Sequence, residues 1–359
     1  PPAHTPDNVR ATGRVSPYPR GDLFMVFEYM DHDLAGLINA GYEFSLRQIR
    51  CLTHQLLEVL DYLHNSKKIM HRDIKCSNLL VGKNMQLKLA DFGLARFATR
   101  EDGRYTNRVI TLWYRPPELL LGETKYNNAV DVWSVGCILA ELLLGSPAFQ
   151  AKKEFDQLEE IWKVCGTPTP DNWPAHTALP QWGNPYQLTT EYPDKNRMRS
   201  EWSGKVRRRL DSYLTKYGPG AGATDPTAAA ERSVDHETNI AMGLLSKLLH
   251  INPSRRCDAR AAKRDVFFTC DPDSLHWQNL KRPGAAESGE IDTGGVSFHE
   301  WETKLMIKEA LASGLIHKGQ KLLDRNKLPE KLRARFVCGP TVAGRGGAGG
   351  EGVDVERAS

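Results

Sequence analysis

The sequence predicts an α+β fold in which helices dominate and strands are few and short. Two helical patterns support this prediction: an amphipathic one over residues 45–66 and an almost wholly apolar one over residues 128–143. A third observation is a short hairpin pattern over residues 79–89. With 359 residues, the chain is long enough for one large domain or two.

The composition excludes several classes of protein. A hydrophobic content of 40% and a charged content of 26% are ordinary for a globular protein, and a net charge of +4 gives no argument for binding nucleic acid. The seven cysteines form no C-x-x-C pair, which indicates reduced thiols in cytosol or nucleus. No apolar run is long enough to span a bilayer, and no signal peptide is visible. Because the first residue is Pro1 and not Met, we expect a fragment.

In chain order, residues 1–20 are polar and proline-rich and predict a loop or disordered lead. The apolar run at 23–27 predicts a buried strand. The amphipathic helix after it has Ser45 as its expected cap, and its repeated leucines are core positions. Strands at 79–81 and 86–89 complete the hairpin.

Further along, Asn128 is the expected cap of the apolar helix, which belongs in the middle of a lobe. Additional helices are expected over 34–40, 155–164, 240–250 and 258–268, and a last one over 301–315 could pack back on the lobe. Residues 171–238 are less regular and predict an insert followed by a partly disordered loop.

Three short motifs occur in an order and at a spacing that are informative about function. His-Arg-Asp-Ile-Lys-Cys-Ser-Asn occupies residues 71–78, Asp-Phe-Gly occupies 91–93, and Pro-Pro-Glu occupies 116–118. A lone Asp-Phe-Gly would more often be an ordinary turn. In this order and spacing, the set matches the catalytic loop, the metal-binding turn and the end of the activation segment of a protein kinase.

The residue types suit phosphoryl transfer, which needs positioning and charge neutralisation more than covalent help. We expect Asp73 to accept the proton of the attacking hydroxyl and Lys75 to hold a γ-phosphate oxygen of ATP. Asn78 and Asp91 are the expected Mg²⁺ ligands, because a hard cation prefers carboxylate and amide oxygens.

The apolar run before residue 31 resembles the hinge between the two lobes of a kinase. The resemblance implies that backbone groups of Glu28 and Met30 pair with the adenine edge, while Phe27 lies behind the base. Leu80 would form the floor beneath the adenine. Asp33 would reach the ribose; it is equally an expected helix N-cap, and the two roles are compatible.

Thr106 lies in a stretch rich in arginine. We interpret it as a phosphorylation switch, because a phosphate there would gather Arg72 and Arg96 and order the segment. The alternative is a solvated threonine in a charged loop.

Four stretches together closely resemble the cyclin-dependent kinases. The best match is their transcriptional branch, which phosphorylates the C-terminal repeat of RNA polymerase II. The matching stretches are Phe27–Leu34, Lys75–Asn78, Asp91–Arg96 and Thr106–Glu118. The likeness covers residues 21 to about 271, the expected kinase domain, interrupted by the insert. Residues 272–359 would be a C-terminal extension, partly helical, with a glycine-rich disordered tail.

The resemblance implies a nuclear serine/threonine kinase that acts on Ser or Thr before Pro and needs a cyclin partner. In that family Val109 and Arg115 would shape the pocket for the proline, and Thr111 would bridge Asp73 and Lys75. No direct contact with nucleic acid or membrane is expected.

Two structural roles also follow from the resemblance. Asp131, inside the apolar helix, would be costly to bury unless hydrogen-bonded, and is expected to anchor the backbone of the catalytic loop. Glu118 is expected to form a buried ion pair with Arg256.

One departure from the family is large. A complete kinase has a glycine-rich loop, a lysine-bearing strand and a glutamate-bearing helix ahead of the hinge, and only about twenty residues precede it here. We therefore expect most of the N-lobe sheet and much of the cyclin-binding surface to be absent. Either this is a truncated piece of an active kinase, or it is a catalytically dead lobe acting as a binding module. The intact Asp73, Asn78 and Asp91 favour the first.

Three remaining patterns have simpler interpretations. The basic cluster at 205–209 could be a docking surface for acidic partners, but a solvated helix face is the favoured interpretation. His299–Glu300 lacks the second histidine of a zinc-protease helix. The G-x-G-x-x-G match at 344–349 follows no strand and is better interpreted as a flexible linker.

Overall fold

The computed structural model describes most of the chain between residues 25 and 336. The residues described are 25–98, 103–183, 192, 197–217, 228–275, 278, 291, 293, 295–324 and 327–336, with the backbone alone for 214–217 and 228–233. The expected lead at 1–20 and the glycine-rich tail at 344–349 lie outside them.

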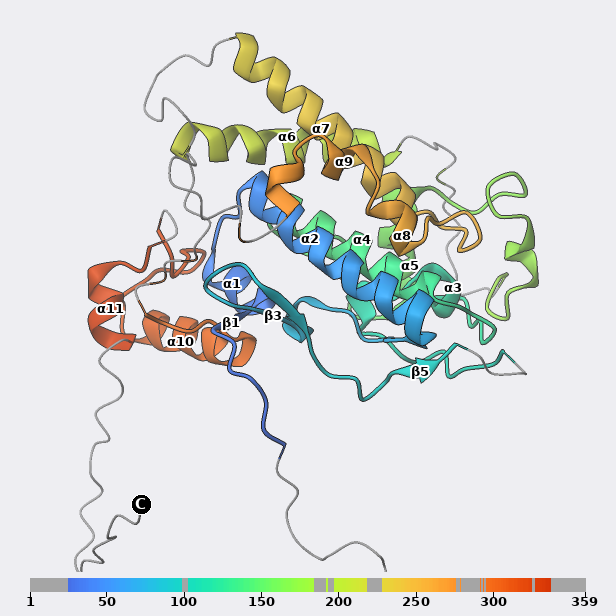
Figure 1. Cartoon of the computed structure of the whole chain (residues 1–359), viewed down its shortest axis with the longest axis horizontal. Coiled ribbons are helices and arrows are strands. Elements are labelled where there is room, and N and C mark those ends of the chain that lie inside the picture. Colours follow the sequence, from blue (N-terminus) through green and yellow to red (C-terminus); the bar gives the residue numbers. More distant parts are fainter. Residues whose placement is uncertain are drawn as a thin grey trace, which may run out of the picture.

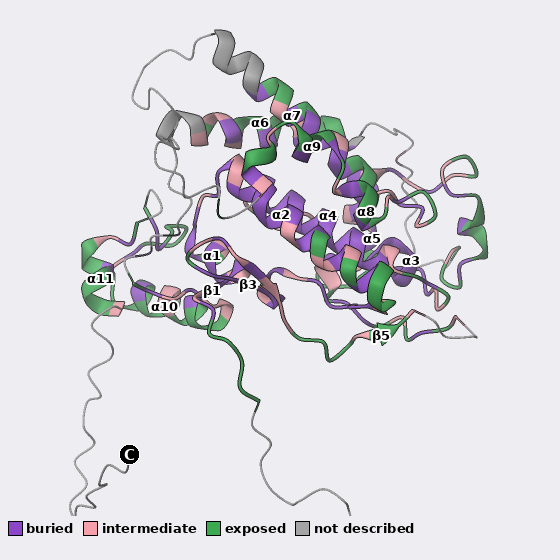
Figure 2. Ribbon diagram, in the orientation of Figure 1, coloured by how far each residue is buried: buried purple, intermediate pink, exposed green. Residues whose placement is uncertain are grey.

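Two long helices, α2 (Leu46–Asp61) and α4 (Ala129–Leu144), lie side by side in the centre of the molecule (Figure 1). Every residue from 130 to 143 of α4 is buried, as expected for a helix that is apolar on nearly all sides. Ser45 caps α2 in a capping box with Gln48, as the sequence predicted. Both helices are largely buried in Figure 2, so this pair forms the centre of the hydrophobic core, against which the surrounding loops pack.

The described residues form further helices. They are α1 (Leu34–Ala40), α3 (Pro117–Leu120), α5 (Glu154–Cys165), α6 (Arg197–Tyr217), α7 (Ala228–Leu248), α8 (Ala259–Ala262), α9 (Val266–Thr269), α10 (Glu300–Ala312) and α11 (Glu330–Phe336). Short 3₁₀ turns cover Cys76–Asn78, Leu112–Tyr114, Pro174–Ala178 and Pro272–Leu275. Helices α6 and α7 pack on each other and on α4. In the described residues, no helix is long and apolar enough to cross a membrane.

The strands are few and short. An antiparallel sheet has the order β1–β3–β4, formed by β1 (His32–Asp33), β3 (Leu79–Val81) and β4 (Leu87–Leu89). A second pair joins β2 (Ile69–Met70) to β5 (Arg96–Phe97). The predicted hairpin and the α+β class dominated by helices are therefore confirmed.

The prediction of a buried strand at 23–27 is wrong for the part that the structure describes. Residues 25–30 have no regular secondary structure, and Val26 and Phe27 are 95% and 78% exposed. An apolar run becomes a strand only if another strand pairs with it, and the described sheet begins at His32. The residues in which an N-lobe sheet would begin precede residue 25, so its expected absence stays a prediction.

Several helix boundaries differ from the sequence expectation. Helix α2 stops at Asp61 and continues as a π-helical turn over Tyr62–Lys67. The expected helix over 258–268 is two short helices, α8 and α9, each with its own aspartate cap. Asn128 makes no capping hydrogen bond; Asn127 Oδ1 accepts from the amide of Ala129 instead, at 2.9 Å.

The insert at 171–238 is more regular than predicted. It contains α6 and the first turns of α7, which begins at Ala228 and not near residue 240. Met198, Trp202, Val206 and Leu210 recur every four residues along α6 and are buried. This stripe is narrow, and most of the residues around it are polar or basic. The composition of the segment therefore does not reveal the apolar period of the helix.

The C-terminal segment packs back on α1, as expected. Helix α10 lies against α1, and α11 lies beside them at one end of the molecule (Figure 1). The approach is close at Gly36, where an added Cβ would overlap the carbonyl group of Phe298. Further along, the amide of Leu323 donates to the Ala40 carbonyl at 3.0 Å. The sequence therefore needs glycine in α1 to admit this segment.

Candidate active site

The backbone of the loop at residues 71–75 is hydrogen-bonded to Asp131 on α4. Asp131 Oδ2 accepts the amide of His71 at 2.9 Å, and Oδ1 accepts the amide of Arg72 at 2.8 Å. His64 Nε2 lies 2.9 Å from the same Oδ2. Arg72 takes a positive φ of 66°, a conformation that this anchoring stabilises. The predicted anchoring role of Asp131 is confirmed.

Asp131 stays charged although no part of it is exposed. Burial by itself would raise its pKa, but the hydrogen bond and charge of His64 and the two backbone donors outweigh burial and lower the pKa below its ordinary value. An ionised carboxylate at this point can therefore act as a permanent acceptor for the loop.

Three side chains donate hydrogen bonds to Asp73. Lys75 Nζ donates to Asp73 Oδ2 at 2.8 Å. Asn78 Nδ2 donates to the backbone carbonyl of Asp73 at 2.8 Å and to Oδ2 at 3.2 Å. Thr111 Oγ1 donates to Asp73 Oδ1 at 3.2 Å. The carboxylate is thus fixed in one orientation, and Thr111 bridges the activation segment to the catalytic loop at Asp73; its predicted bridge to Lys75 stays a prediction.

The Asp-Phe-Gly turn adjoins this loop. The amide of Ala90, just before it, donates to the Asn78 carbonyl at 2.9 Å. Asp91 has a positive φ of 60°, and its Oδ1 accepts the amide of Gly93 at 3.2 Å. The structure therefore brings the predicted acidic and amide residues of the two motifs to neighbouring turns.

His71 ties the two turns together. Its Nε2 lies 3.1 Å from the Ala90 carbonyl, its Nδ1 lies 3.3 Å from the amide of Asp73, and its ring packs edge-on against Phe92 at 4.8 Å between centroids. Burial lowers the pKa of His71. The ring is therefore neutral at pH 7, with the proton on Nε2 for the carbonyl and a lone pair on Nδ1 for the amide.

The oxygens of Asn78 and Asp91 fit a magnesium ion chemically. The Asn78 side chain donates through Nδ2 to Asp73, which leaves its Oδ1 as the acceptor of this amide. Asp91 contributes a carboxylate on the neighbouring turn. One amide oxygen and one carboxylate are the hard donors that Mg²⁺ takes when it keeps several waters or phosphate oxygens.

The predicted adenine-binding residues lie along the exposed start of the described chain. Phe27 is exposed, Met30 is buried, and Glu28 forms an ion pair with Lys88 of β4. Leu80 lies opposite Asp33 in the register of β1 and β3. The contacts of these residues with a base stay predictions.

Asp33 is a helix cap, as predicted. Its Oδ1 accepts the amide of Gly36 at 2.6 Å. Its Oδ2 accepts the amide of Glu300 at 2.8 Å and lies 3.6 Å from His299 Nδ1. The hydrogen bond to Asp33 raises the pKa of His299. With both oxygens occupied and only 5% of the residue exposed, the ribose contact of Asp33 stays a prediction.

Sequence reasoning missed the approach of His299 and Glu300 to the hinge. In the sequence the two residues resemble only half of a zinc motif, whereas in the structure they lie next to Asp33 because α10 begins at Glu300. No local signal could have revealed a contact between residues 267 positions apart. The helix start after His299 was the one visible clue.

The activation segment is connected to the catalytic loop through Tyr126. Arg72 Nη1 donates to Tyr126 Oη at 2.9 Å, and that hydroxyl donates to the Thr106 carbonyl at 2.6 Å. Thr106 itself is exposed. Arg96 lies in β5 and donates to the carbonyl of Ala95 at 2.7 Å. Arg72 is thus close to the predicted phosphorylation site, while the approach of Arg96 stays a prediction.

The candidate pocket for the substrate includes a residue that the sequence did not reveal. Val109 is buried, and Ile110 takes a positive φ of 65°, which is rare for a β-branched residue. Arg115 donates to the Ile110 carbonyl through Nε at 3.1 Å and Nη2 at 3.0 Å, and through Nη1 to Glu154 at 2.6 Å. The arginine thus stabilises a strained backbone that sequence patterns cannot show.

Buried polar groups connect these loops to the core. Arg256 and Glu118 form the predicted pair, with two hydrogen bonds of 2.8 and 2.9 Å between nearly inaccessible side chains. Glu141 on α4 accepts from Tyr114 Oη at 2.8 Å and from Cys76 Sγ at 3.4 Å. Burial raises the pKa of Glu141, and these two donors oppose the rise. The role of Glu141 had not been predicted.

Comparisons with known proteins agree with this geometry. Residues 14–268 match the protein kinase domain family. Cyclin-dependent kinase C-1 of Oryza sativa subsp. japonica is 44% identical over 263 residues, which cover 71% of this chain and 44% of the relative. CTD kinase subunit alpha of Schizosaccharomyces pombe is 39% identical over 287 residues, covering 79% of this chain and 41% of the relative.

Solved structures give the same result. The chain resembles one from the yeast RNA polymerase II CTD kinase complex CTDK-1, with a TM-score of 0.55, 38% identity, and coverage of 68% of this chain and 69% of that one. The chain spans less than half the length of the curated relatives named above. The chain therefore belongs to the protein kinase family and, as its motifs indicate, resembles the cyclin-dependent kinases.

Proposed function

We propose that this chain carries the catalytic centre of a cyclin-dependent serine/threonine kinase, which transfers the γ-phosphate of ATP to Ser or Thr followed by Pro. The observation that carries the proposal is the fixed Asp73 carboxylate, held by Lys75 and Thr111 beside the turn that bears Asp91. A positioned base beside a cation-binding turn is what phosphoryl transfer requires.

In the proposed mechanism, Asp73 accepts the proton of the substrate hydroxyl. Its two donors, Lys75 and Thr111, hold the carboxylate in place before the substrate arrives, so no side chain has to reorient at the moment of reaction. From this position beside Asp73, the charge of Lys75 would also neutralise a γ-phosphate oxygen once the nucleotide is bound.

ATP would be bound with magnesium, for which Asn78 and Asp91 supply the protein oxygens. Such an ion neutralises the negative charge of the phosphates. The role of the protein is to orient these oxygens: Asp73 fixes the Asn78 amide, and Gly93 fixes the Asp91 carboxylate. A relative in the CAK complex from Chaetomium thermophilum was solved with ATP-γ-S, which supports nucleotide binding here.

Preference for proline follows from the occupied carbonyl of Ile110. Arg115 already donates twice to this carbonyl, so it is a poor acceptor for the next substrate amide. A residue with a backbone N–H would leave that donor unpaired, whereas proline has none. Val109 and Arg115 are therefore the proposed determinants of the position after the phosphorylated residue.

The partners are proposed from the relatives. The names of two relatives, a CTD kinase subunit and a CTD kinase complex, support the C-terminal repeat of RNA polymerase II as substrate, and with it a nuclear location. The cyclin-dependent kinases among the relatives support a cyclin as partner. A dead binding module would not need Asp73, Asn78 and Asp91, all of which are present.

The test is phosphate transfer from ATP to a Ser-Pro peptide by the full-length product of the gene, purified with its associated cyclin. A Ser-Ala peptide should be a much poorer substrate because of the Ile110 carbonyl. Arg115→Lys should reduce this preference, because lysine cannot donate twice from a fixed fork. Equal rates on the two peptides in the wild type would refute proline direction. Sequencing the full-length transcript would decide whether an N-lobe precedes this chain.

A further inference from the structure

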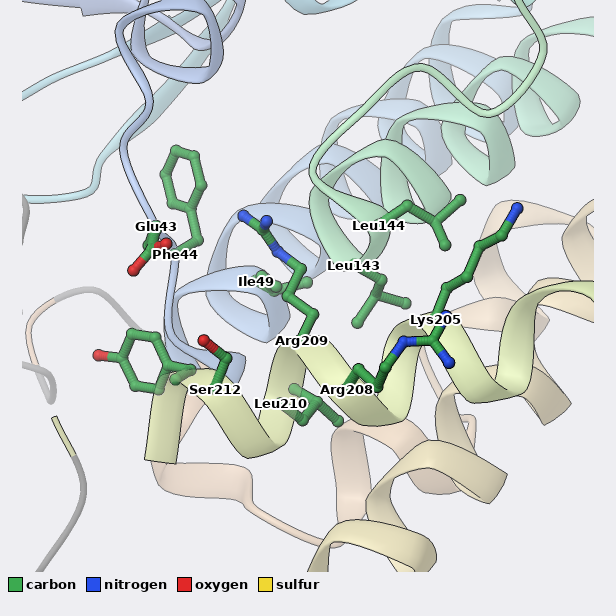
Figure 3. A pocket seen from close by; sticks show the side chains of 11 residues that line it. Glu43, Phe44, Ile49, Leu143, Leu144, Lys205, Arg208, Arg209, Leu210 and Ser212 are labelled. Carbon is green, nitrogen blue, oxygen red and sulfur yellow. The ribbon is translucent and has the colours of Figure 1, made fainter. Parts of the chain in front are cut away.

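A cavity of about 290 Å³ opens between the start of α2, the end of α4 and the outer helix α6 (Figure 3). It is remote from the catalytic loop, because Asp131 and Leu144 lie at opposite ends of α4, about 20 Å apart at the rise of an α-helix. A ligand in this cavity would leave the catalytic residues accessible.

The floor of the cavity is apolar. Its residues are Phe44 just before α2, Ile49 in the first turn of α2, Leu143 and Leu144 at the end of α4, and Leu210 of α6. Phe44, Ile49 and Leu143 are almost inaccessible to solvent, so this part of the lining is firmly packed. It suits one bulky apolar side chain.

The rim of the cavity is cationic. Lys205, Arg208 and Arg209 all line it from α6. Among the described residues, no acidic side chain forms a hydrogen bond or ion pair with any of the three. Arg207 on the same helix points elsewhere and does have partners: Asp235 at 3.1 Å and Asp211 at 3.9 Å. Glu43 is the one acid among the residues that line the cavity, and its charge acts on Arg209, so three cations face a single acid there.

Arg209 is positioned before any ligand arrives. Its guanidinium lies against Gly145 at the C-terminal end of α4, where an added Cβ would overlap it. A cation is favoured there by the helix dipole. Burial lowers the pKa of Arg209, and the charge of Glu43 partly opposes this. A fixed, partly desolvated guanidinium binds a carboxylate at low conformational cost.

We propose that this cavity docks an acidic segment of a partner protein, with a bulky apolar side chain on the floor and flanking carboxylates on Lys205, Arg208 and Arg209. Charge complementarity selects an acidic partner, and the apolar floor favours a peptide side chain. The site goes beyond the proposed function: it would hold a substrate or regulator on the kinase while the catalytic loop stays open.

The test is the fluorescence anisotropy of a labelled peptide, Asp-Glu-Glu-Leu-Phe-Asp-Glu-Glu, titrated with the whole chain. Arg208→Gln combined with Arg209→Gln should weaken binding by at least about tenfold, because charge-assisted hydrogen bonds are lost. Arg207→Gln, which removes the same charge from the same helix outside the cavity, should leave binding within about twofold. Added salt should weaken binding. Circular dichroism and urea unfolding check that each variant is folded.

A second peptide with Ser-Ser in place of Leu-Phe should bind at least about tenfold more weakly, since the floor is then unfilled. Absence of binding, equal effects at Arg207 and at Arg208 with Arg209, or equal affinity of the two peptides would each overturn the proposal. Binding of phosphatidylserine vesicles or inorganic phosphate without the peptide, or self-association in sedimentation that the Arg208 and Arg209 changes abolish, would assign the cavity to another occupant and overturn it as well. None of these measurements depends on kinase activity.

Discussion

Single buried charges determine where the catalytic loop lies. Asp131 has no exposed surface, yet it accepts from two backbone amides and from His64. A buried charge with three donors is stable as long as all three remain. The sequence predicted this role from an acid inside an apolar helix, because such a residue has to be compensated. It did not predict His64 as the third donor.

Asp131→Asn should lower the free energy of unfolding by about 3 kcal/mol, because an amide cannot accept from all three donors and turns its own N–H groups toward some of them. Urea unfolding at pH 7 measures the change. The control is Asp171→Asn, an exposed aspartate, which should change stability by less than about 0.5 kcal/mol. An Asp131 variant as stable as this control would contradict the anchoring role.

The same residue gives a pH dependence with a definite sign. The pKa of Asp131 is lowered in the folded protein, so its charge stabilises the fold above the unfolded pKa of about 3.9, and this contribution is lost as the pH falls through the folded value. The difference in stability between wild type and Asp131→Asn should therefore narrow below about pH 4. A difference that stays constant in acid would count against a lowered pKa.

Arg256→Ala should destabilise the protein by about 3–5 kcal/mol, because it leaves Glu118 charged, buried and unpaired. Glu118→Leu combined with Arg256→Met should recover much of that loss, since no charge is then buried. A thermodynamic cycle from urea unfolding of Glu118→Leu, Arg256→Met and the double variant measures the coupling. Additive losses would mean that the two residues act independently.

Elements with their own apolar pattern could be predicted, whereas elements that depend on distant partners could not. Helices α2 and α4 and the hairpin of β3 and β4 carry local signals of the correct period. The run at 23–27 carries a strand signal too, but no described strand pairs with it. Helix α6 was missed because its buried stripe is one residue wide in an arginine-rich segment.

The close packing of α10 and the residues before it against α1 depends on Gly36. Gly36→Ala places a methyl group on the carbonyl of Phe298 and should loosen the segment from residue 296 through α10, with faster amide hydrogen exchange there. Gly243→Ala is the matched control, because a Cβ at this helical position meets nothing within 4 Å. Unchanged exchange in α10 of the Gly36 variant would contradict the described packing.

The activation segment is expected to be a switched element. If Thr106 is phosphorylated, Arg72, which is linked to the Thr106 carbonyl through Tyr126, should stabilise the phosphate by its charge. We expect a phosphopeptide containing Thr106 in a mass spectrum of the cell-derived protein, and slower proteolysis after Tyr105 in that form. Unmodified Thr106 in fully active protein would refute the switch.

At the scale of the whole molecule, the catalytic motifs could be located from the sequence because each is contiguous and their order is informative. Their mutual placement needed the structure: His71 joins the two turns, Glu141 ties Cys76 to Tyr114, and Arg115 holds the backbone of Ile110. These links join residues far apart in the chain, or involve a backbone conformation that residue type does not disclose. The docking of the C-terminal segment against the hinge belongs to the same class.

The most direct test of the account is magnesium-dependent phosphate transfer to a Ser-Pro peptide by the full-length product with its cyclin, compared between wild type, Asp73→Asn and Asp171→Asn. The account predicts transfer by the wild type and the Asp171 variant, and a loss of at least about a hundredfold for Asp73→Asn, because the proton acceptor is removed. Binding of ATP should be nearly unchanged by that substitution. Transfer that proceeds at the wild-type rate without the Asp73 carboxylate would contradict the central claim.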